Sequence, residues 1–326
     1  MRDIKFYTTS VIKMMVEYSG GSIMDNPNDL LKVDLLFLGR HKLISIWYHM
    51  IQKYELRKLL GKHNVIMIEA YLSRLKKYSE IRNNELLSFT NVLNESGISY
   101  ALRKGESIKE YYIDPSHRVS NDYDILVNKN SMSEILEILE ITGYVEGYYS
   151  ERQAKIIKHS RGELLAYMLS PDHSPHLTKV VDGVPVTFDF AFTLAWNKHE
   201  SAQKYVLNNL NISRNKQDVN VLKGDSLYLD TVLHLYRESR FVNDLKGRAP
   251  YLVNYLDVML MKDFPKLKTK ESKCINEDIS TLKSFKDGTI LDKNIILEGG
   301  KYKDTMFPIN KYIFEVNGTS FDGYIS

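Results

Sequence analysis

The sequence predicts an α+β protein, in which a mixed sheet with its helices is flanked by helical segments. Apolar residues recur at helical spacing through residues 1–94 and again through 221–265. Between these segments, residues 95–220 contain short apolar runs and an Asp-Gly pair set between two alternating runs, which is typical of a β-hairpin. Residues 266–326 turn polar, with a hint of short strands. We therefore expect an N-terminal helical region, a core, a C-terminal helical region and a polar tail with these boundaries.

The composition is that of an ordinary globular protein. Of 326 residues, 43% are hydrophobic and 26% charged, and the net charge of +3 is too small to indicate nucleic-acid binding by itself. The single cysteine, Cys274, excludes an internal disulfide and fits a reducing compartment. No apolar run is long enough for a membrane span, and the first residues lack the apolar block of a signal peptide. The sequence thus predicts a cytoplasmic protein.

The N-terminal helical region shows an apolar stripe of Met, Tyr and Leu that repeats until Gly97. Such a stripe is more typical of a helix-packing face than of a ligand site. His49 and His63 have no partner at metal-ligand spacing, so we assign both to structure. In the C-terminal region, two helical patterns follow Asp225 and precede Pro265.

Two carboxylates open the most informative strand of the core. Residues 118–127 read Arg-Val-Ser-Asn-Asp-Tyr-Asp-Ile-Leu-Val, so Asp122 and Asp124 lie two apart and share one face of a strand. Two ionised carboxylates at that distance repel each other unless a cation lies between them, and carboxylate oxygens suit Mg²⁺. The alternative is a strand that begins with two exposed acids. Upstream lie a short apolar strand, the pair Lys104-Gly105 and a helix from residue 106 to about 113.

Downstream, the pattern Ser131-x-x-Glu134 predicts a capping box for a helix that ends at Gly143. Residues 163–170 are expected to form a strand of the same sheet, and residues 197–210 another helix.

The predicted hairpin specifies a register. If Asp182 and Gly183 are the two loop residues, His176 lies opposite Asp189, with Cβ atoms about 5 Å apart on one face. Asp189 also lies between two core-facing aromatic residues, Phe188 and Phe190. The alternative is that Asp189 lies on the solvated face of an edge hairpin.

The wording L-R-K-G followed by R-x-S-x-D-Y-D-I-L-V resembles an uncharacterised bacterial nucleotidyltransferase family of the polymerase-β (minimal nucleotidyltransferase) superfamily, over roughly residues 30–260. The resemblance implies a polymerase-β-like nucleotidyltransferase core between the helical segments. It also implies a third carboxylate on the later strand, at Asp189, with a histidine on the preceding strand.

The resemblance further implies a role for each candidate residue. Two Mg²⁺ (or Mn²⁺) ions would be held by Asp122, Asp124 and Asp189, and Asp189 would also be able to take the acceptor proton. Phosphate binding is implied for Lys104, Gly105, Ser107, Arg118 and Ser120, with a structural Arg–Asp pair an equal alternative for Arg118. An acceptor or orienting role is open for His176, His234 and Arg237, the last two sharing one helix face.

The expected reaction is transfer of a nucleoside monophosphate from an NTP to an acceptor, with release of pyrophosphate. A small molecule or a peptide is favoured over a long nucleic acid as acceptor, while a protein side chain or a tRNA end stays open. Glu106 departs from the superfamily pattern, because it places an acid beside the implied phosphate site. Two alternatives remain: a catalytically inactive binding protein of this fold, and a toxin-like transferase that modifies protein or tRNA.

Overall fold

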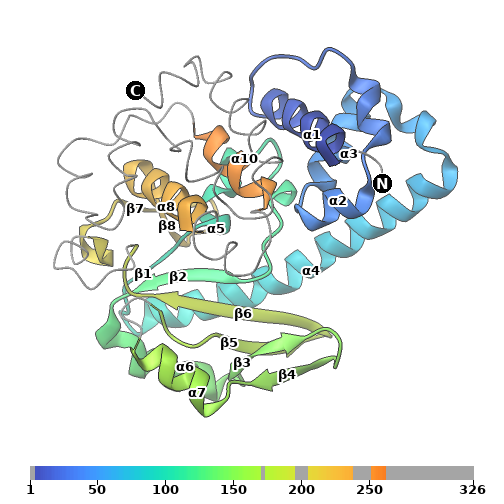
Figure 1. Cartoon of the computed structure of the whole chain (residues 1–326). Helices are drawn as coiled ribbons and strands as arrows, with labels where there is room; N and C mark the ends of the chain where they lie inside the picture. Colours follow the sequence, from blue (N-terminus) through green and yellow to red (C-terminus); the bar gives the residue numbers. More distant parts are fainter. Residues whose placement is uncertain (1–3, 170–172, 195–204, 238–250, 262–326) are drawn as a thin grey trace. The chain divides into compact units, whose positions relative to one another are not determined.

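The computed structural model describes residues 4–169, 173–194, 205–237 and 251–261 (Figure 1). These residues form two compact units, each built from separate stretches of the chain. The helical unit contains residues 4–73, 110–118, 231–237 and 251–261, and the sheet unit contains residues 74–109, 119–169, 173–194 and 205–230. The units therefore differ from the four consecutive segments expected from the sequence, because one helix, α4 (Lys62–Glu95), contributes to both.

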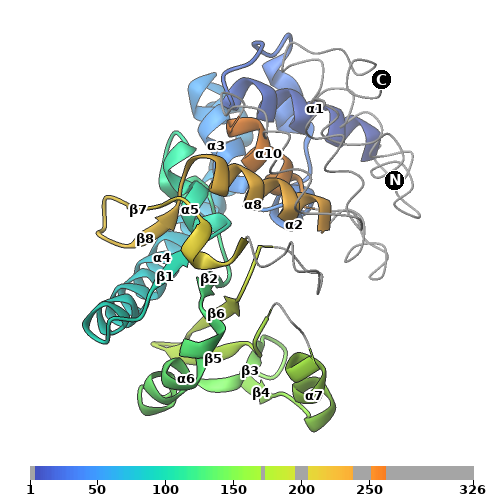
Figure 2. The same ribbon diagram turned by 90° about the vertical axis from the view of Figure 1, so that its left-hand side faces the viewer.

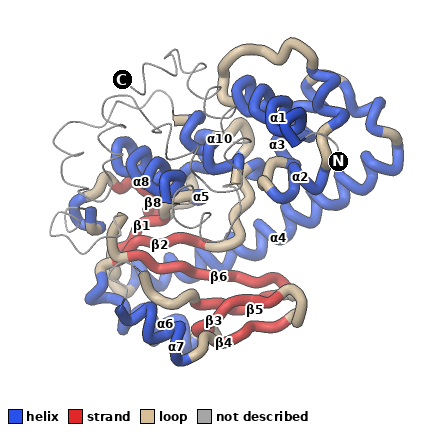
Figure 3. The backbone as a smooth tube through the Cα atoms, viewed as in Figure 1, coloured by secondary structure: helices blue, strands red, loops and turns tan. Residues whose placement is uncertain are grey.

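The sheet unit is organised on one mixed sheet of eight strands, ordered β4-β3-β5-β6-β2-β1-β8-β7 (Figure 3). The strands are β1 (Tyr100–Leu102), β2 (Tyr123–Val127), β3 (Val145–Ser150), β4 (Lys155–Lys158), β5 (Leu177–Val181), β6 (Val184–Ala191), β7 (Ile212–Arg214) and β8 (Asn220–Leu222). β2 pairs with β6 in parallel, β1 pairs with β8 in parallel, and every other neighbouring pair is antiparallel. The mixed sheet with helices thus matches the expected α+β class.

The core face of this sheet is covered by α4 and by α6 (Met132–Ile141). Besides its share of α4, the sheet unit contains α5 (Gly105–Ile108), α6 (Met132–Ile141), α7 (Arg161–Leu169) and the first half of α8 (Gly224–Arg237). Phe89 of α4 and Ile135 of α6 belong to one buried cluster with the alternate β2 residues Tyr123 and Ile125. Figure 1 shows α4 running along the sheet, and Figure 2 shows α6 and α7 on opposite sides of β3 and β4.

Strand alternation decides which residues the core leaves for chemistry. Phe188 and Phe190 of β6 and Ile125 of β2 are fully buried in the core cluster. Successive side chains of a strand point to opposite faces, so Asp124 and Asp189 point to the face away from that core. The predicted placement of Asp189 between two core-facing aromatics is confirmed.

The expected hairpin register is also confirmed. β5 and β6 are joined by Asp182 and Gly183, both at positive φ (50° and 75°), and Val181 pairs with Val184. The regular pairing ends one step before His176, whose Nε2 lies 3.7 Å from Oδ2 of Asp189. The turn at Asp182 and Gly183 therefore determines that His176 lies beside Asp189, although the turn is several residues away.

Two local predictions were wrong. Residues 163–169 belong to helix α7 rather than to a strand, because Ser160 caps it: Ser160 Oγ accepts from Glu163 N (3.3 Å) and Glu163 Oε2 accepts from Ser160 N (2.7 Å). The capping box expected at Ser131 does not form, since a 3₁₀ turn already places Ser131 in helical conformation before α6. The end of α6 before Gly143, which has φ of 88°, is confirmed.

Other expected elements were shorter or lie elsewhere. The helix expected from residue 106 to about 113 is reduced to α5 and a 3₁₀ turn over Lys109–Tyr111. The connector before α8 contains two strands, β7 and β8, instead of one. Most of the helix expected at 197–210, and the tail at 266–326, lie outside the described residues.

The helical unit packs short helices around buried aromatic and aliphatic side chains. Its helices are α1 (Ile4–Tyr18), α2 (Leu35–Arg40), α3 (Ile44–Lys53), the first part of α4, the end of α8 and α10 (Leu252–Leu260). Trp47 is 1% exposed, and its indole N–H donates to the carbonyl of Leu30 at 2.9 Å. Within the described parts of the chain, no helix combines the length and apolar composition needed to cross a membrane.

A buried charged cluster ties two stretches of the helical unit together. The guanidinium of Arg118 donates to both carboxylate oxygens of Asp257 at 2.8–3.1 Å, and Tyr112 donates to Oδ1 of the same carboxylate at 2.5 Å. Arg118 and Asp257 are 6% and 4% exposed. The structure thus gives Arg118 the Arg–Asp pair that the sequence left open, and Asp257 the structural role expected of a polar residue among apolar ones.

His41 makes the stability of this unit sensitive to acid. It is 8% exposed, its Nδ1 accepts from the N–H of Leu252 at 3.2 Å, and burial, with the charge of Arg40, lowers its pKa to about 4. Below pH 6.5 the unfolded chain therefore takes up a proton that the folded chain does not. The contribution is complete above pH 6.5 and lost towards pH 4, so the free energy of unfolding should fall by about 2 kcal/mol between pH 7 and pH 5 from this group.

The measurement is urea unfolding of wild type and His41→Asn at pH 7, 6 and 5. Asparagine keeps a side-chain acceptor for Leu252 but does not titrate, so the stability difference between the two proteins should shift in favour of the variant as the pH falls. A difference that is the same at all three pH values would contradict the prediction.

Candidate functional site

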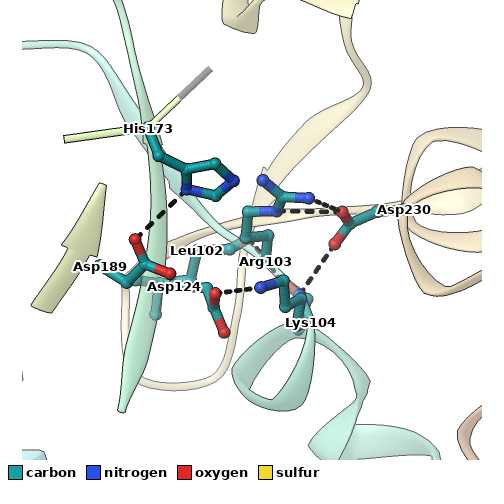
Figure 4. A network of polar contacts seen from close by, with 8 residues as sticks. Leu102, Arg103, Lys104, Asp124, His173, Asp189 and Asp230 are labelled. Atoms are coloured by element: carbon teal, nitrogen blue, oxygen red, sulfur yellow. Dashed lines mark hydrogen bonds and ion pairs between the residues drawn. The ribbon is translucent and has the colours of Figure 1, made fainter. Parts of the chain in front are cut away.

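The candidate site is built on two neighbouring parallel strands of the sheet unit. In the β2–β6 register, Asp124 lies directly opposite Asp189, and each residue is 9% exposed (Figure 4). The strands hold both carboxylates on the face away from the aromatic core, so each backbone is rigid where its side chain enters the site. The two acids that sequence reasoning placed on separate strands are therefore brought together.

The negative charges of these acids repel one another. Burial raises the pKa of Asp124 to about 7; the charge of Lys104 lowers it, while the nearby charges of Asp122 and Asp189 raise it further. Like charges held this close resist simultaneous ionisation, and a cation bound between them relieves the repulsion. All three acids that we singled out therefore act on one electrostatic site.

Asp189 is the member that stays ionised. Burial by itself raises its pKa, but the adjacent rings of His173 and His176 and the charge of Lys104 hold the pKa of Asp189 well below its usual range. His173 Nδ1 lies 3.4 Å from Oδ1 and His176 Nε2 lies 3.7 Å from Oδ2, so one imidazole faces each oxygen. The same contact raises the pKa of His176. The two rings fix the plane of the carboxylate.

Lys104 supplies the cation of the site. Its ammonium forms an ion pair with Oδ1 of Asp124, and its side chain is 14% exposed. Its backbone has φ of 50° and ψ of −126°, a conformation of tight turns that glycine usually occupies. A lysine there costs of order 1–3 kcal/mol, and such strain persists only where the surroundings enforce it. Lys104 takes this conformation, whereas its neighbour Gly105 begins α5.

A second buried ion pair, between Arg103 and Asp230, surrounds that turn. Arg103 Nε and Nη2 donate to Oδ1 of Asp230 at 2.9 and 2.5 Å, and the backbone N–H of Lys104 donates to Oδ2 at 2.9 Å (Figure 4). Arg103 is 5% exposed and Asp230 is 0% exposed. One carboxylate on α8 therefore binds two consecutive residues of the turn after β1.

Asp122 and Ser120 precede β2 and do not belong to it. Asp122 is exposed and lies one residue before the strand begins, and its charge acts on Asp124 and on His176. The Ser120 hydroxyl is buried and has no hydrogen-bond partner among the described residues. Arg82 of α4 donates to the carbonyls of Ser120 (3.0 Å) and of Pro185 (3.0 Å), which ties this loop to the beginning of β6.

Glu106 and Ser107 are engaged locally. The carboxylate of Glu106 pairs with Lys109 at 2.5 Å, so the acid beside the implied phosphate site is neutralised within its own turn. Ser107 is 1% exposed and its hydroxyl donates to the carbonyl of Leu102 at 2.5 Å, which leaves it a structural role in the turn.

Three further candidates belong to the helical unit. Arg118 belongs to the helical unit, where it binds Asp257. His234 lies in the part of α8 that belongs to the helical unit, and the side chain of Arg237 lies outside the described residues.

The two carboxylates suit a hard divalent cation that is bound partly by the protein and partly by substrate phosphates. Among the described residues, no group of three or more His, Cys, Asp and Glu side chains is arranged to hold a metal ion. Mg²⁺ does not need such a cage: it commonly keeps several waters and binds one or two carboxylates together with substrate phosphates. Asp124 and Asp189 provide two such carboxylates side by side.

Sequence reasoning missed His173, Arg103 and Asp230. His173 precedes the predicted hairpin by a few residues and was visible only as half of a His-x-x-His pattern. Arg103 stands beside Lys104 in the quoted motif, whereas Asp230 is 127 positions from Arg103 and carries no local signal.

Comparison with known proteins gives one family. A sequence model of a family described as uncharacterised nucleotidyltransferases matches residues 35–263, which is more than half of the chain. No match was found among curated proteins or among solved structures.

Proposed function

Because the chain belongs to this family of uncharacterised nucleotidyltransferases, we propose that it transfers a nucleoside monophosphate from an NTP to an acceptor in a metal-dependent reaction, with release of pyrophosphate. The observation that carries the proposal is the β2–β6 register, which sets Asp124 beside Asp189 on the face away from the core. The ammonium of Lys104 forms an ion pair with Asp124, and the charge of Asp189 also acts on it. A buried site of two acids and one lysine has the charges that a metal–triphosphate complex requires.

In the proposed reaction, an oxygen of the acceptor attacks the α-phosphorus of the NTP and forms a new P–O bond. The bond from the α-phosphorus to the oxygen that bridges to the β-phosphate breaks, and pyrophosphate leaves with that electron pair. The proton of the acceptor hydroxyl passes to water. The divalent cations, when bound, supply the charge that neutralises the phosphates and polarises the reacting oxygens.

The residues of the chain divide the remaining work. Asp124 and Asp189 would hold the cations, and Asp122, in the loop before β2, would add a third carboxylate. The low pKa of Asp189 suits cation binding better than proton abstraction, because an efficient general base has a pKa near the working pH. Lys104 exchanges its contact with Asp124 for the triphosphate. Ser120 offers an unpartnered buried hydroxyl to a phosphate oxygen.

For the acceptor, a small molecule or a peptide is favoured over a long nucleic acid, since the net charge of the chain is only +3. A protein side chain or a tRNA end remains compatible with the same chemistry. We propose Mg²⁺ or Mn²⁺ as cation and a cytoplasmic location.

The test is thermal unfolding with each of the four NTPs, with and without Mg²⁺. Ligand at a hundredfold excess over its Kd stabilises the folded state by about 2.7 kcal/mol, which raises the melting temperature by several degrees. We expect a shift that needs the metal, favours one base and disappears in the Asp122→Asn/Asp124→Asn variant.

The matched control is Asp182→Asn/Asp218→Asn. Both residues are exposed in the sheet unit and sit at positive φ, which asparagine tolerates. This control should keep the full shift. Absence of any NTP-dependent shift in wild type, or an equal shift in the Asp122/Asp124 variant, would contradict the proposed function.

A further inference from the structure

We propose that Asp230 is a positioning residue of this site, which acts by holding the backbone of Lys104 in its unfavourable turn conformation and so directs the ammonium at the reacting phosphates. The second half of this statement rests on the proposed function. The first half concerns the geometry of the chain alone and is testable without a nucleotide.

The backbone conformation of Lys104 is costly for a residue other than glycine. At φ of 50° and ψ of −126°, the Cβ of a lysine is crowded by its own backbone, and glycine would adopt these angles freely. Left alone, the turn after β1 would relax to another conformation and carry the ammonium away from Asp124. Some contact must therefore select the observed conformation.

Asp230 makes that contact with both of its oxygens. Oδ2 accepts from the backbone N–H of Lys104 at 2.9 Å, and Oδ1 accepts from Arg103 at 2.5 and 2.9 Å. Because Asp230 binds both Arg103 and the backbone of Lys104, it restrains the backbone conformation between these two residues. The carboxylate has 0% exposure, so water does not compete for these oxygens.

Arg103 gives the carboxylate its own orientation. Its guanidinium is 5% exposed, and the pair buries one positive and one negative charge with no net charge. A buried ion pair is costly to desolvate, and apolar residues in its place would often stabilise the fold equally well. The retained pair is thus explained by what it orients: the next residue along the chain is the lysine of the site.

The substitution Asp230→Asn removes the hydrogen bond to the Lys104 backbone and keeps the size of the side chain. Asparagine keeps the size and one oxygen for Arg103, but its amide group cannot accept from the N–H of Lys104. The nucleotide-free measurement is hydrogen exchange of the Lys104 amide, which we expect to accelerate about tenfold or more. The matched control, Asp225→Asn on the same helix, should leave that exchange rate unchanged.

The second measurement is a double-mutant cycle on NTP affinity with Asp230→Asn and Lys104→Met. Asp230→Asn alone should weaken NTP binding about tenfold, the loss expected for one hydrogen bond to a charged group. In the Lys104→Met background it should have an effect of about twofold or less, because the group that it positions is gone. Additive losses would show a merely structural role and overturn the proposal.

A third variant covers the case in which Asp230→Asn folds poorly. Lys104→Gly/Asp230→Asn should then melt at a higher temperature than Asp230→Asn, because glycine removes the strain that Asp230 holds. An unchanged melting temperature, or unchanged exchange at Lys104 in Asp230→Asn, would refute the positioning role. If wild type binds no NTP, the proposed function fails, while amide exchange and this rescue still decide the role of Asp230.

Discussion

Asp189→Asn is expected to lower the rate of pyrophosphate release from the preferred NTP by about 10²- to 10³-fold, the usual loss when a group that stabilises reacting charge is removed. Asparagine has the same shape and still meets His173 and His176, so the fold should be preserved. The substitution removes the negative charge that the two histidine rings stabilise. The measurement is pyrophosphate release with Mg²⁺, in parallel with the melting temperature.

Asp182→Asn is the matched control for this experiment. It is the same chemical change, seven residues away at the exposed tip of the same hairpin. It should leave pyrophosphate release within about twofold, the range of neutral surface changes. Should Asp189→Asn retain wild-type release while folding normally, the assignment of Asp189 to the reaction would be wrong.

Asp257→Ala is expected to lower the free energy of unfolding by about 3–5 kcal/mol, the cost of leaving a buried charge without its partner. The change removes the two Asp257 oxygens that accept from the Arg118 guanidinium, one of which also accepts from the Tyr112 hydroxyl. Neither Arg118 nor Asp257 is more than 6% exposed, so water cannot replace the lost contacts. Urea unfolding followed by circular dichroism measures the loss.

The control is Arg214→Ala, which breaks the exposed pair of Arg214 with Asp218. Exposed ion pairs contribute about 0–1 kcal/mol, so this variant should unfold close to wild type. Replacing both buried partners, in Arg118→Met/Asp257→Leu, should recover part of the loss because no unpaired charge remains. Equal stability of Asp257→Ala and Arg214→Ala would show that the buried cluster is not a stabilising element.

Much of the site follows from local rules. The Asp-Gly turn specifies the hairpin register, and strand alternation then sends Phe188 and Phe190 to the core and Asp189 to the opposite face. Asp124 follows from the same alternation on β2. Local rules also produced errors: Ser131 and Ser160 both begin a Ser-x-x-Glu pattern, and only the second caps a helix.

The sequence by itself determined the α+β class, the helical flanks, the hairpin and the carboxylates of the two strands, because each depends on neighbours a few residues apart. Only the tertiary structure decided that β2 lies parallel to β6, that His173 faces Asp189, and that Asp230 binds Arg103 and Lys104. Arg118, the first residue of the motif that contains Asp122 and Asp124, binds Asp257, 139 positions away. Contacts at such separations follow from how the whole chain packs, and no local pattern of residues records them.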